Sequence, residues 1–159
     1  MAIARRRTNE AVEEFQRAID LNPNFAAAHG YLGLALTLGG PLDESIVHSE
    51  RAIRLSPHDP QNAVFNVHLA AAHYHMGRYA EAANFGRKAI QQRFGLPNGH
   101  RIYTASLAQA GQIEEARAEL AILQELLPEN SIAWVEQHIP LNPSRMAKLV
   151  EGLRKAGMQ

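Results

Sequence analysis

The sequence contains no cysteine, and this absence removes several classes of chemistry. Without thiols there is no disulfide framework, no thiolate nucleophile and no cysteine-ligated zinc. The absence is compatible with a reducing compartment, and we expect a cytoplasmic protein. An excess of one charge is also lacking, since 16 Lys and Arg balance 16 Asp and Glu. Because no overall field draws the chain to nucleic acid or to an anionic membrane, neither is expected as a partner.

Long hydrophobic runs are missing as well. Nowhere do about 18 apolar residues follow one another, as a membrane-spanning helix would require. The segment 1–7 carries arginines but no apolar stretch behind them, so no export signal is predicted. A chain of 159 residues with 46% hydrophobic and 20% charged residues is an ordinary mixture for one folded domain.

Internal repetition is the informative feature of this sequence. The segment 18–23 (AIDLNP) returns at 52–57 (AIRLSP), and the two prolines are 34 residues apart. Gly77 and Gly111 are also 34 apart, whereas Gly40 and Gly77 are 37 apart, which indicates a three-residue insertion around 58–61. A period of 34 residues is typical of helix-turn-helix repeats that stack side by side.

At these positions the sequence resembles the tetratricopeptide-repeat (TPR) family. Three repeats align with its motif, over 26–59, 63–96 and 97–130, and 8–25 resembles a repeat whose first helix is mostly absent. The matching residues are Leu32, Gly33, Leu36, Gly40, Ser45, Ala52 and Pro57, then Leu69, Ala70, His73, Gly77, Tyr79, Ala82 and Ala89, then Tyr103, Thr104, Leu107, Gly111, Ala116, Leu120 and Pro128. The motif is broken where Gly86 replaces a bulky residue, Phe94 a proline and Leu123 an alanine.

The resemblance implies an all-α fold, a TPR superhelix of antiparallel helix pairs stacked as a right-handed solenoid. The residues favour the same fold independently. Apolar residues recur at intervals of three and four within 61–76 and 98–110, which places a stripe on one face of each helix. Short connections that contain glycine make neighbouring helices antiparallel, and small residues allow them to approach closely.

The C-terminal segment 131–157 is interpreted as an aborted repeat followed by a capping helix, so that 1–159 forms a single domain. Residues 131–138 begin a helix with Trp134 at a motif position, and Ile139-Pro140 ends it. Asn142 is a plausible N-cap, with Pro143 at the first helical position and Gly157 as a C-terminal cap. Between them lies one apolar stripe, formed by Met146, Leu149, Val150 and Leu153.

A closer resemblance rests on the two ends of the chain. The segments 5–11, 15–26 and 149–157 are similar to the C-terminal TPR region of bacterial class III adenylate and guanylate cyclases and of related winged-helix transcriptional regulators. This likeness implies a regulatory attachment within a larger bacterial signalling protein. It does not imply cyclase activity, since no cyclase or DNA-binding domain is present in these residues.

The eight histidines do not form a metal-binding pattern. His68, His73 and His75 share one predicted helix, but 68 and 75 are two turns apart, about 10.5 Å along the axis, and 73 and 75 point to opposite sides. His29 and His100 occupy a motif position where a large half-buried residue is expected. We therefore expect structural histidines, no metal, no cofactor and no enzymatic activity, because no nucleophile and base pair is recognisable either.

The resemblance places a partner-binding surface on the concave side of the first helices. Carried over by motif position, the candidate residues are Leu34, Leu38, Val64, Val67, Tyr74, His75, Asn98, Arg101 and Gln109. This surface is small, apolar and nearly uncharged, and it lacks the lysines and asparagines with which some TPR domains hold a C-terminal carboxylate. The predicted partner is an apolar peptide or protein segment, with Tyr74 as central anchor and Arg101 as polar contact.

The same residues allow three other interpretations. Neighbouring parts of the domain could themselves fill some of the concave positions. The chain could self-associate as a homodimer or spacer, because a truncated first repeat would expose Phe15, Ala18 and Ile19. A helical-repeat RNA binder would need a basic groove, and Arg101 is the single basic residue among the candidates that is always charged.

Folding without metal is testable directly. Because the expected core consists of stacked helices alone, circular-dichroism melting curves recorded with and without EDTA should superimpose. A melting temperature that falls by many degrees on chelation would contradict this and would direct attention back to the histidines.

Overall fold

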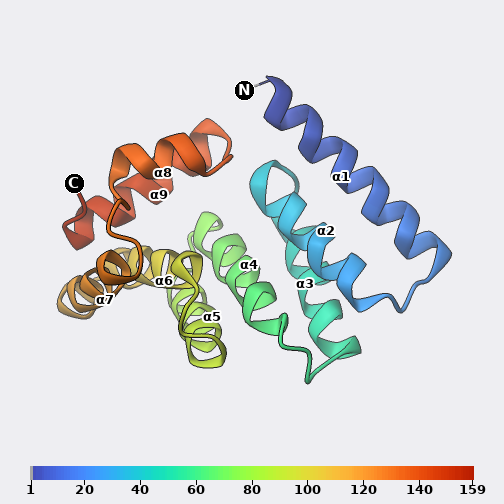
Figure 1. The fold of residues 1–159 in the computed structure, drawn as a ribbon, viewed down its shortest axis with the longest axis horizontal. Helices are drawn as coiled ribbons and strands as arrows, with labels where there is room; N and C mark the ends of the chain where they lie inside the picture. Colours follow the sequence, from blue (N-terminus) through green and yellow to red (C-terminus); the bar gives the residue numbers. More distant parts are fainter. Residues whose placement is uncertain (1) are drawn as a thin grey trace.

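The structure, a computed structural model, describes the backbone of residues 2–159 and the side chains from residue 7 onward. Met1 and the side chains of residues 2–6 lie outside the described residues. Arg5 and Arg6, which contribute to the resemblance at the N-terminus, are among these residues. Over 2–159 the chain forms nine α-helices and no strand (Figure 1). They are α1 (Ala2–Leu21), α2 (Ala26–Gly39), α3 (Leu42–Leu55), α4 (Asn62–His75), α5 (Tyr79–Gln92), α6 (Pro97–Gln109), α7 (Ile113–Leu126), α8 (Ile132–His138) and α9 (Pro143–Ala156).

The helices stack as consecutive antiparallel pairs, α2 with α3, α4 with α5, and α6 with α7. The first helices of the pairs, α2, α4 and α6, contact one another in order and form an inner row. Two of the turns between partners contain a left-handed glycine, with φ of 80° at Gly77 and 84° at Gly111. The predicted all-α superhelix is confirmed. None of the helices in the described part of the chain is long and apolar enough to cross a membrane.

Small residues set how closely the helices approach. Ala52, Ala82, Ala89 and Ala116 are all completely buried. Gly86 departs from the repeat motif, and the structure explains why a larger residue does not fit there. A Cβ atom at this position would lie 2.9 Å from the Cβ of Tyr103 on α6. Tyr103 therefore fills the space that the expected bulky residue would need.

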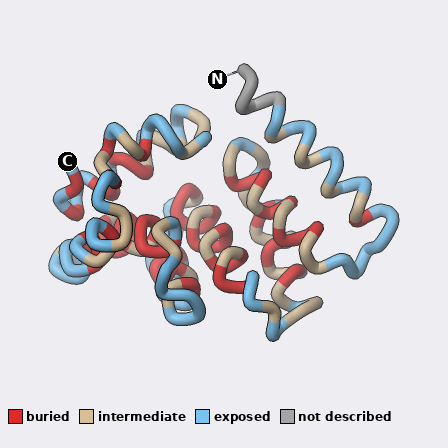
Figure 2. The backbone as a smooth tube through the Cα atoms, viewed as in Figure 1, coloured by how far each residue is buried: buried red, intermediate tan, exposed pale blue. Residues whose placement is uncertain are grey.

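The apolar stripe of α1 is covered, contrary to expectation. Ile19 is buried with Leu32 and Leu36 of α2, and Phe15 and Ala18 pack against the same cluster. The other sides of α1 are largely exposed (Figure 2). The prediction that Phe15, Ala18 and Ile19 form an exposed face is wrong, because α2 buries Ile19 and covers part of Phe15 and Ala18.

Two histidines, His29 and His100, each link the first helix of a pair to the preceding loop and to the second helix of the same pair. Nε2 of His29 lies 3.0 Å from the carbonyl oxygen of Pro23, and its Nδ1 lies 2.9 Å from Nδ1 of His48 on α3. His100 repeats this arrangement with the carbonyl oxygen of Phe94 and the carboxylate of Glu119 on α7. In both cases the partners lie six residues before and 19 residues after the histidine. The expected structural role of both histidines is confirmed.

Helix α9 has the predicted caps at Asn142 and Gly157, and α8 has an N-cap at Ser131 that was not predicted. The Ser131 side chain accepts from the Trp134 amide at 3.2 Å, and Asn142 accepts from the Arg145 amide at 2.9 Å. Helix α9 ends at Gly157 with φ of 105°. Its predicted stripe is buried at Leu149, Val150 and Leu153, whereas Met146 is half-buried.

Helix α9 does not simply extend the stack beyond α8. It packs chiefly on α6 and also contacts α4, α7 and α8, so it lies back across the inner row. Its basic residues reach the C-terminal ends of the inner helices in turn: Arg145 donates to the carbonyl oxygens of Leu36, Thr37 and Gly40 at α2, Lys148 to that of His75 at α4, and Lys155 to the side chain of Gln109 at α6. Cations suit the partial negative charge at a helix C-terminus. The first turn of the last helix, α9, thus contacts the first full repeat.

The docking of α9 can be tested at Gly152. A Cβ atom at this position would lie 2.3 Å from the hydroxyl oxygen of Tyr74 and 3.1 Å from the carbonyl oxygen of Ala105. Alanine favours a helix over glycine by about 1 kcal/mol, yet we expect Gly152→Ala to destabilise the protein by about 1–3 kcal/mol in urea unfolding, because the collision overpacks the contact. Gly39→Ala is the matched control, since a Cβ there meets nothing within 4 Å. Stabilisation by Gly152→Ala would show that α9 is not docked in solution.

Candidate functional site

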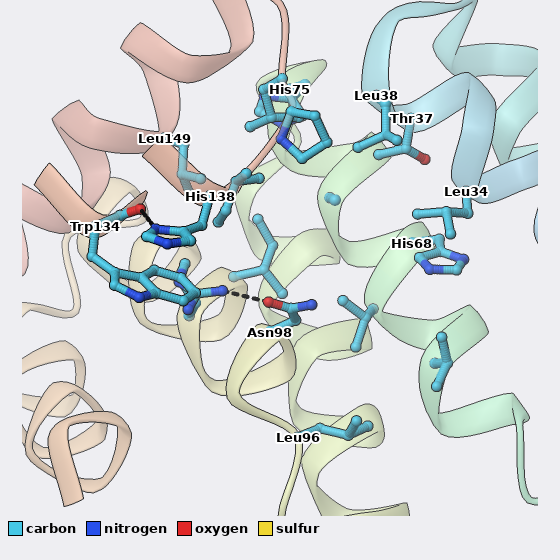
Figure 3. A pocket seen from close by; sticks show the side chains of 18 residues that line it. Leu34, Thr37, Leu38, His68, His75, Leu96, Asn98, Trp134, His138 and Leu149 are labelled. Carbon is cyan, nitrogen blue, oxygen red and sulfur yellow. Dashed lines mark hydrogen bonds between the residues drawn. The ribbon is translucent and has the colours of Figure 1, made fainter. Parts of the chain in front are cut away.

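A hollow of about 410 Å³ lies between the inner row and the C-terminal helices (Figure 3). Its walls come from α2, α4 and α6 on one side and from α8 and α9 on the other. The connection between α8 and α9, residues 139–142, is here called the strap. Ile139, Pro140 and Leu141 of the strap line the hollow, and the amide of Asn142 lies 3.4 Å from the carbonyl oxygen of Leu38.

The wall formed by the inner row is apolar. Leu34 and Leu38 are one turn apart on α2, and Val64 and Val67 are one turn apart on α4, so each helix presents a short stripe. All four side chains are half-buried. They keep apolar surface that no other helix covers, which a ligand entering the hollow would bury.

Arg101 on α6 contributes the permanent charge of the inner-row wall. Only 2% of the residue is exposed, and burial lowers its pKa to about 10. Its Nε and Nη2 donate to Oδ1 of Asn130 at 3.1 and 2.7 Å, and Nη1 donates to Oδ1 of Asn98. The guanidinium carbon lies 5.2 Å from the centre of the Trp134 ring. The arginine is held by two neutral amides and one aromatic ring.

Two buried histidines also line the hollow. His68 and His75 come from α4, and Nδ1 of each is buried without a hydrogen-bond partner. Burial lowers the pKa of His68 to about 4. The pKa of His75 is lowered to about 3, first by burial and then by the positive charges of Arg145 and Lys148. Both imidazoles are therefore neutral near pH 7.

The structure brings seven of the nine candidate residues to this hollow: Leu34, Leu38, Val64, Val67, His75, Asn98 and Arg101. The other two are engaged by α9. Tyr74 is completely buried, and its hydroxyl donates to the carbonyl oxygen of Lys148 at 2.7 Å. Gln109 accepts from Lys155 at 2.6 Å. The prediction of Tyr74 as a central anchor is wrong, because α9 covers the part of the concave face where Tyr74 lies.

Sequence reasoning missed the part of the hollow that the C-terminal segment supplies. Trp134, His138 and the strap all line it, and the imidazole of His138 stacks on the Trp134 ring with centroids 4.5 Å apart. The Ile139-Pro140 pair predicts the end of a helix. Nothing in the local pattern, however, shows that the chain after this stop turns back toward α2.

The side chains that line the hollow are mostly apolar. Among the described residues, no group of three histidines or carboxylates lies close enough together to hold a metal ion. None of the described residues that line the hollow is a serine, aspartate or glutamate, and Thr37 is the single hydroxyl. The arrangement offers apolar contact, a buried guanidinium and an aromatic ring, which are means of recognition.

Comparison with known proteins shows the fold. A sequence model of the TPR repeat matches residues 4–39, which span α1 and α2. No curated protein matches the sequence significantly.

Several solved structures superpose over most of the chain. A crystal structure of MamA is 14% identical, covers 94% of this chain and 86% of its own, and gives a TM-score of 0.68. A second MamA structure is 20% identical, with coverages of 86% and 70% and a TM-score of 0.65. YrrB, described as a TPR protein with an unusual peptide-binding site, is 16% identical, with coverages of 95% and 77% and a TM-score of 0.64. At these identities the likeness establishes the superhelical fold and not a shared ligand.

The buried histidines predict an acid-sensitive fold. An unfolded histidine has a pKa near 6.5. Below that pH, His68 and His75 are therefore protonated in the unfolded chain but stay neutral in the folded protein. The stability they contribute is complete above pH 6.5 and is lost as the pH falls toward 4 and 3. The loss is on the order of 2 kcal/mol for each histidine at pH 5. The lowered pKa values of His48 and His73 act in the same direction.

Urea unfolding at pH 7 and pH 5 measures this loss. We expect His68→Asn to reduce the difference between the two pH values, whatever its effect on stability at pH 7. His58→Asn, at an exposed position, is the control and should leave the difference unchanged. An equal difference in wild type and His68→Asn would contradict the assignment.

Proposed function

We propose that this chain is a non-catalytic binding module that holds an apolar segment of another protein in the hollow beneath the strap. The observation that carries the proposal is the pair of leucines on α2 and the pair of valines on α4, which face the same hollow and remain half-buried. Binding there would remove apolar surface from water, which is the main source of affinity in such sites. The peptide-binding site of the structurally similar YrrB supports a peptide ligand for this fold.

The setting of the module is proposed from the sequence ends. Their resemblance to the C-terminal TPR region of bacterial cyclases and related regulators supports a regulatory attachment in a larger bacterial signalling protein. A cytoplasmic location agrees with the absence of cysteine. In such a protein the module would recruit or sense a partner, and the output would come from another domain.

Self-association is the second candidate, and the structure weakens its basis. Because Phe15, Ala18 and Ile19 pack on α2, a dimer through this end would have to use Leu21 and Phe25, which are 84% and 47% exposed. These two exposed side chains near one turn form a smaller apolar surface than the walls of the hollow do. Binding of a partner segment is therefore the favoured function.

A matched pair of substitutions tests the location of the site. Val67→Glu places a charge on the wall of the hollow, whereas Val47→Glu makes the same change on α3 at a residue that is 58% exposed and lies outside the hollow. Peptides selected by phage display on the wild-type protein should be rich in leucine, valine and phenylalanine. We expect Val67→Glu to weaken their binding about tenfold or more, as for the loss of a buried contact at the centre of a site.

The control variant separates the hollow from the rest of the surface. Val47→Glu should bind the selected peptides as the wild type does. If both variants bind equally well while remaining folded by circular dichroism, the concave hollow is not the binding site.

A further inference from the structure

Arg101 is a buried cation without an acidic partner. Among residues 7–159, none of the ion pairs involves it, although it is almost inaccessible to water. Buried charges in proteins are normally paired, because transfer of an ion out of water costs several kcal/mol. The neutral amides of Asn98 and Asn130 satisfy some of its donors but supply no negative charge.

The guanidinium also retains donors. A guanidinium has five N–H groups, and the three hydrogen bonds to Asn98 and Asn130 use three of them. The N–H bonds of a guanidinium lie in its plane, so a further partner of the remaining donors would approach in that plane, near the Trp134 ring. In-plane approach is the geometry in which carboxylates bind arginine. Figure 3 shows Asn98 and Trp134 near each other among the residues that line the hollow.

The surroundings favour an anion throughout the hollow. None of the described residues that line it is acidic. At the end near the strap, Arg145 and Lys148 lie close enough to His75 to lower its pKa. These two cations donate to backbone carbonyl oxygens and have no carboxylate partner among the described residues. An occupant with a negative charge among apolar groups is the electrostatic complement of this interior.

We propose that the protein segment held in the hollow carries one internal aspartate or glutamate, flanked by apolar residues, whose carboxylate pairs with Arg101. The inference rests on the proposed function and adds the chemistry by which the segment is selected. The apolar walls supply contact area, and the carboxylate fixes the register of the segment by offsetting a charge that the folded protein leaves unpaired. A segment without the acidic side chain would bury its apolar groups and leave Arg101 as it is.

The test uses an array of synthetic peptides built from leucine, valine and serine, each made with glutamate or glutamine at its centre. Acetylated and amidated ends remove the terminal charges, so the central carboxylate is the only anion. Trp134 is the only tryptophan of the chain and lies against Arg101, so its fluorescence reports binding at this group. For peptides that bind, we expect the glutamate form to bind about tenfold or more tightly, as for a hydrogen-bonded charge pair in a desolvated site.

The comparison is made first on the wild-type protein, so it does not depend on whether an Arg101 variant folds. Arg101→Lys should retain part of the preference for glutamate, and Arg101→Met should abolish it if that variant folds. Lys88→Met removes an exposed cation of α5 outside the hollow and should leave the preference unchanged.

Each outcome bears on one of the two proposals. Equal affinity of the glutamate and glutamine forms overturns the pairing with Arg101 and leaves apolar binding in the hollow intact. Binding of neither form overturns both proposals. Tighter binding of glutamine peptides with a free C-terminus, or of decanoate in preference to every peptide, would show that the carboxylate belongs to a chain end or to a small amphiphile, and would also overturn the proposal.

Discussion

Close contact between helices at alanine, serine and glycine is the constraint on which this structure depends. Where two helices meet at Ala52, Ala82, Ala89 or Ala116, no side chain keeps their backbones apart. Gly33 shows the same limit, since a Cβ atom there would lie 2.2 Å from the hydroxyl of Ser49. Because the two helices of a pair lie so close together, little space remains between them. The larger apolar side chains of the inner row can therefore be buried only by contacts outside their own pair.

The apolar side chains on the concave side of the inner row fall into two groups, one buried by α9 and one only half-buried beside the hollow. Tyr74 and the C-terminal half of α6 are covered by α9, which buries Leu149, Val150 and Leu153 in return. Leu34, Leu38, Val64 and Val67 face the strap across a hollow and stay half-buried. The chain thus fills one part of its own concave face and leaves the neighbouring part open.

Local sequence patterns predicted the features that local physics decides. The 34-residue period, the glycine turns at Gly77 and Gly111, and the caps at Asn142 and Gly157 depend on residues close together in the chain, and the structure has all of them. Seven of the nine candidate residues line the hollow because motif positions on stacked helices fall on one face. The TPR resemblance therefore placed these seven residues together on the inner row, and their role in binding a partner stays a prediction.

Contacts between distant segments could not be predicted in the same way. The apolar stripe of α9 would suit many surfaces, and its interval of three and four does not say that Gly152 lies against Tyr74. The interpretation of the last helix as a cap predicts the burial of its apolar stripe, but it does not predict that this helix packs mainly on α6. The charge state of the hollow was also missed, because a motif position shows that Arg101 is present but not that no carboxylate reaches it.

The histidines illustrate how one residue type serves two purposes in this fold. His29 and His100 bind partners through both ring nitrogens and hold a loop against two helices. His68 and His75 are buried with Nδ1 unpartnered and line the hollow. The first pair repeats with the architecture, whereas the second pair belongs to α4 alone.

The contact of Arg145 with α2 has a consequence for how the molecule folds. In a linear repeat array each unit touches only its neighbours, so the ends can unfold separately and stability is a sum of local terms. Here a side chain near the C-terminus binds carbonyl oxygens 105 to 109 residues earlier. This contact joins the first full repeat to the last helix, so unfolding of either end removes an interaction from the other. The array gains the cooperativity of a closed globular domain, and it also acquires the slower folding that long-range contacts impose.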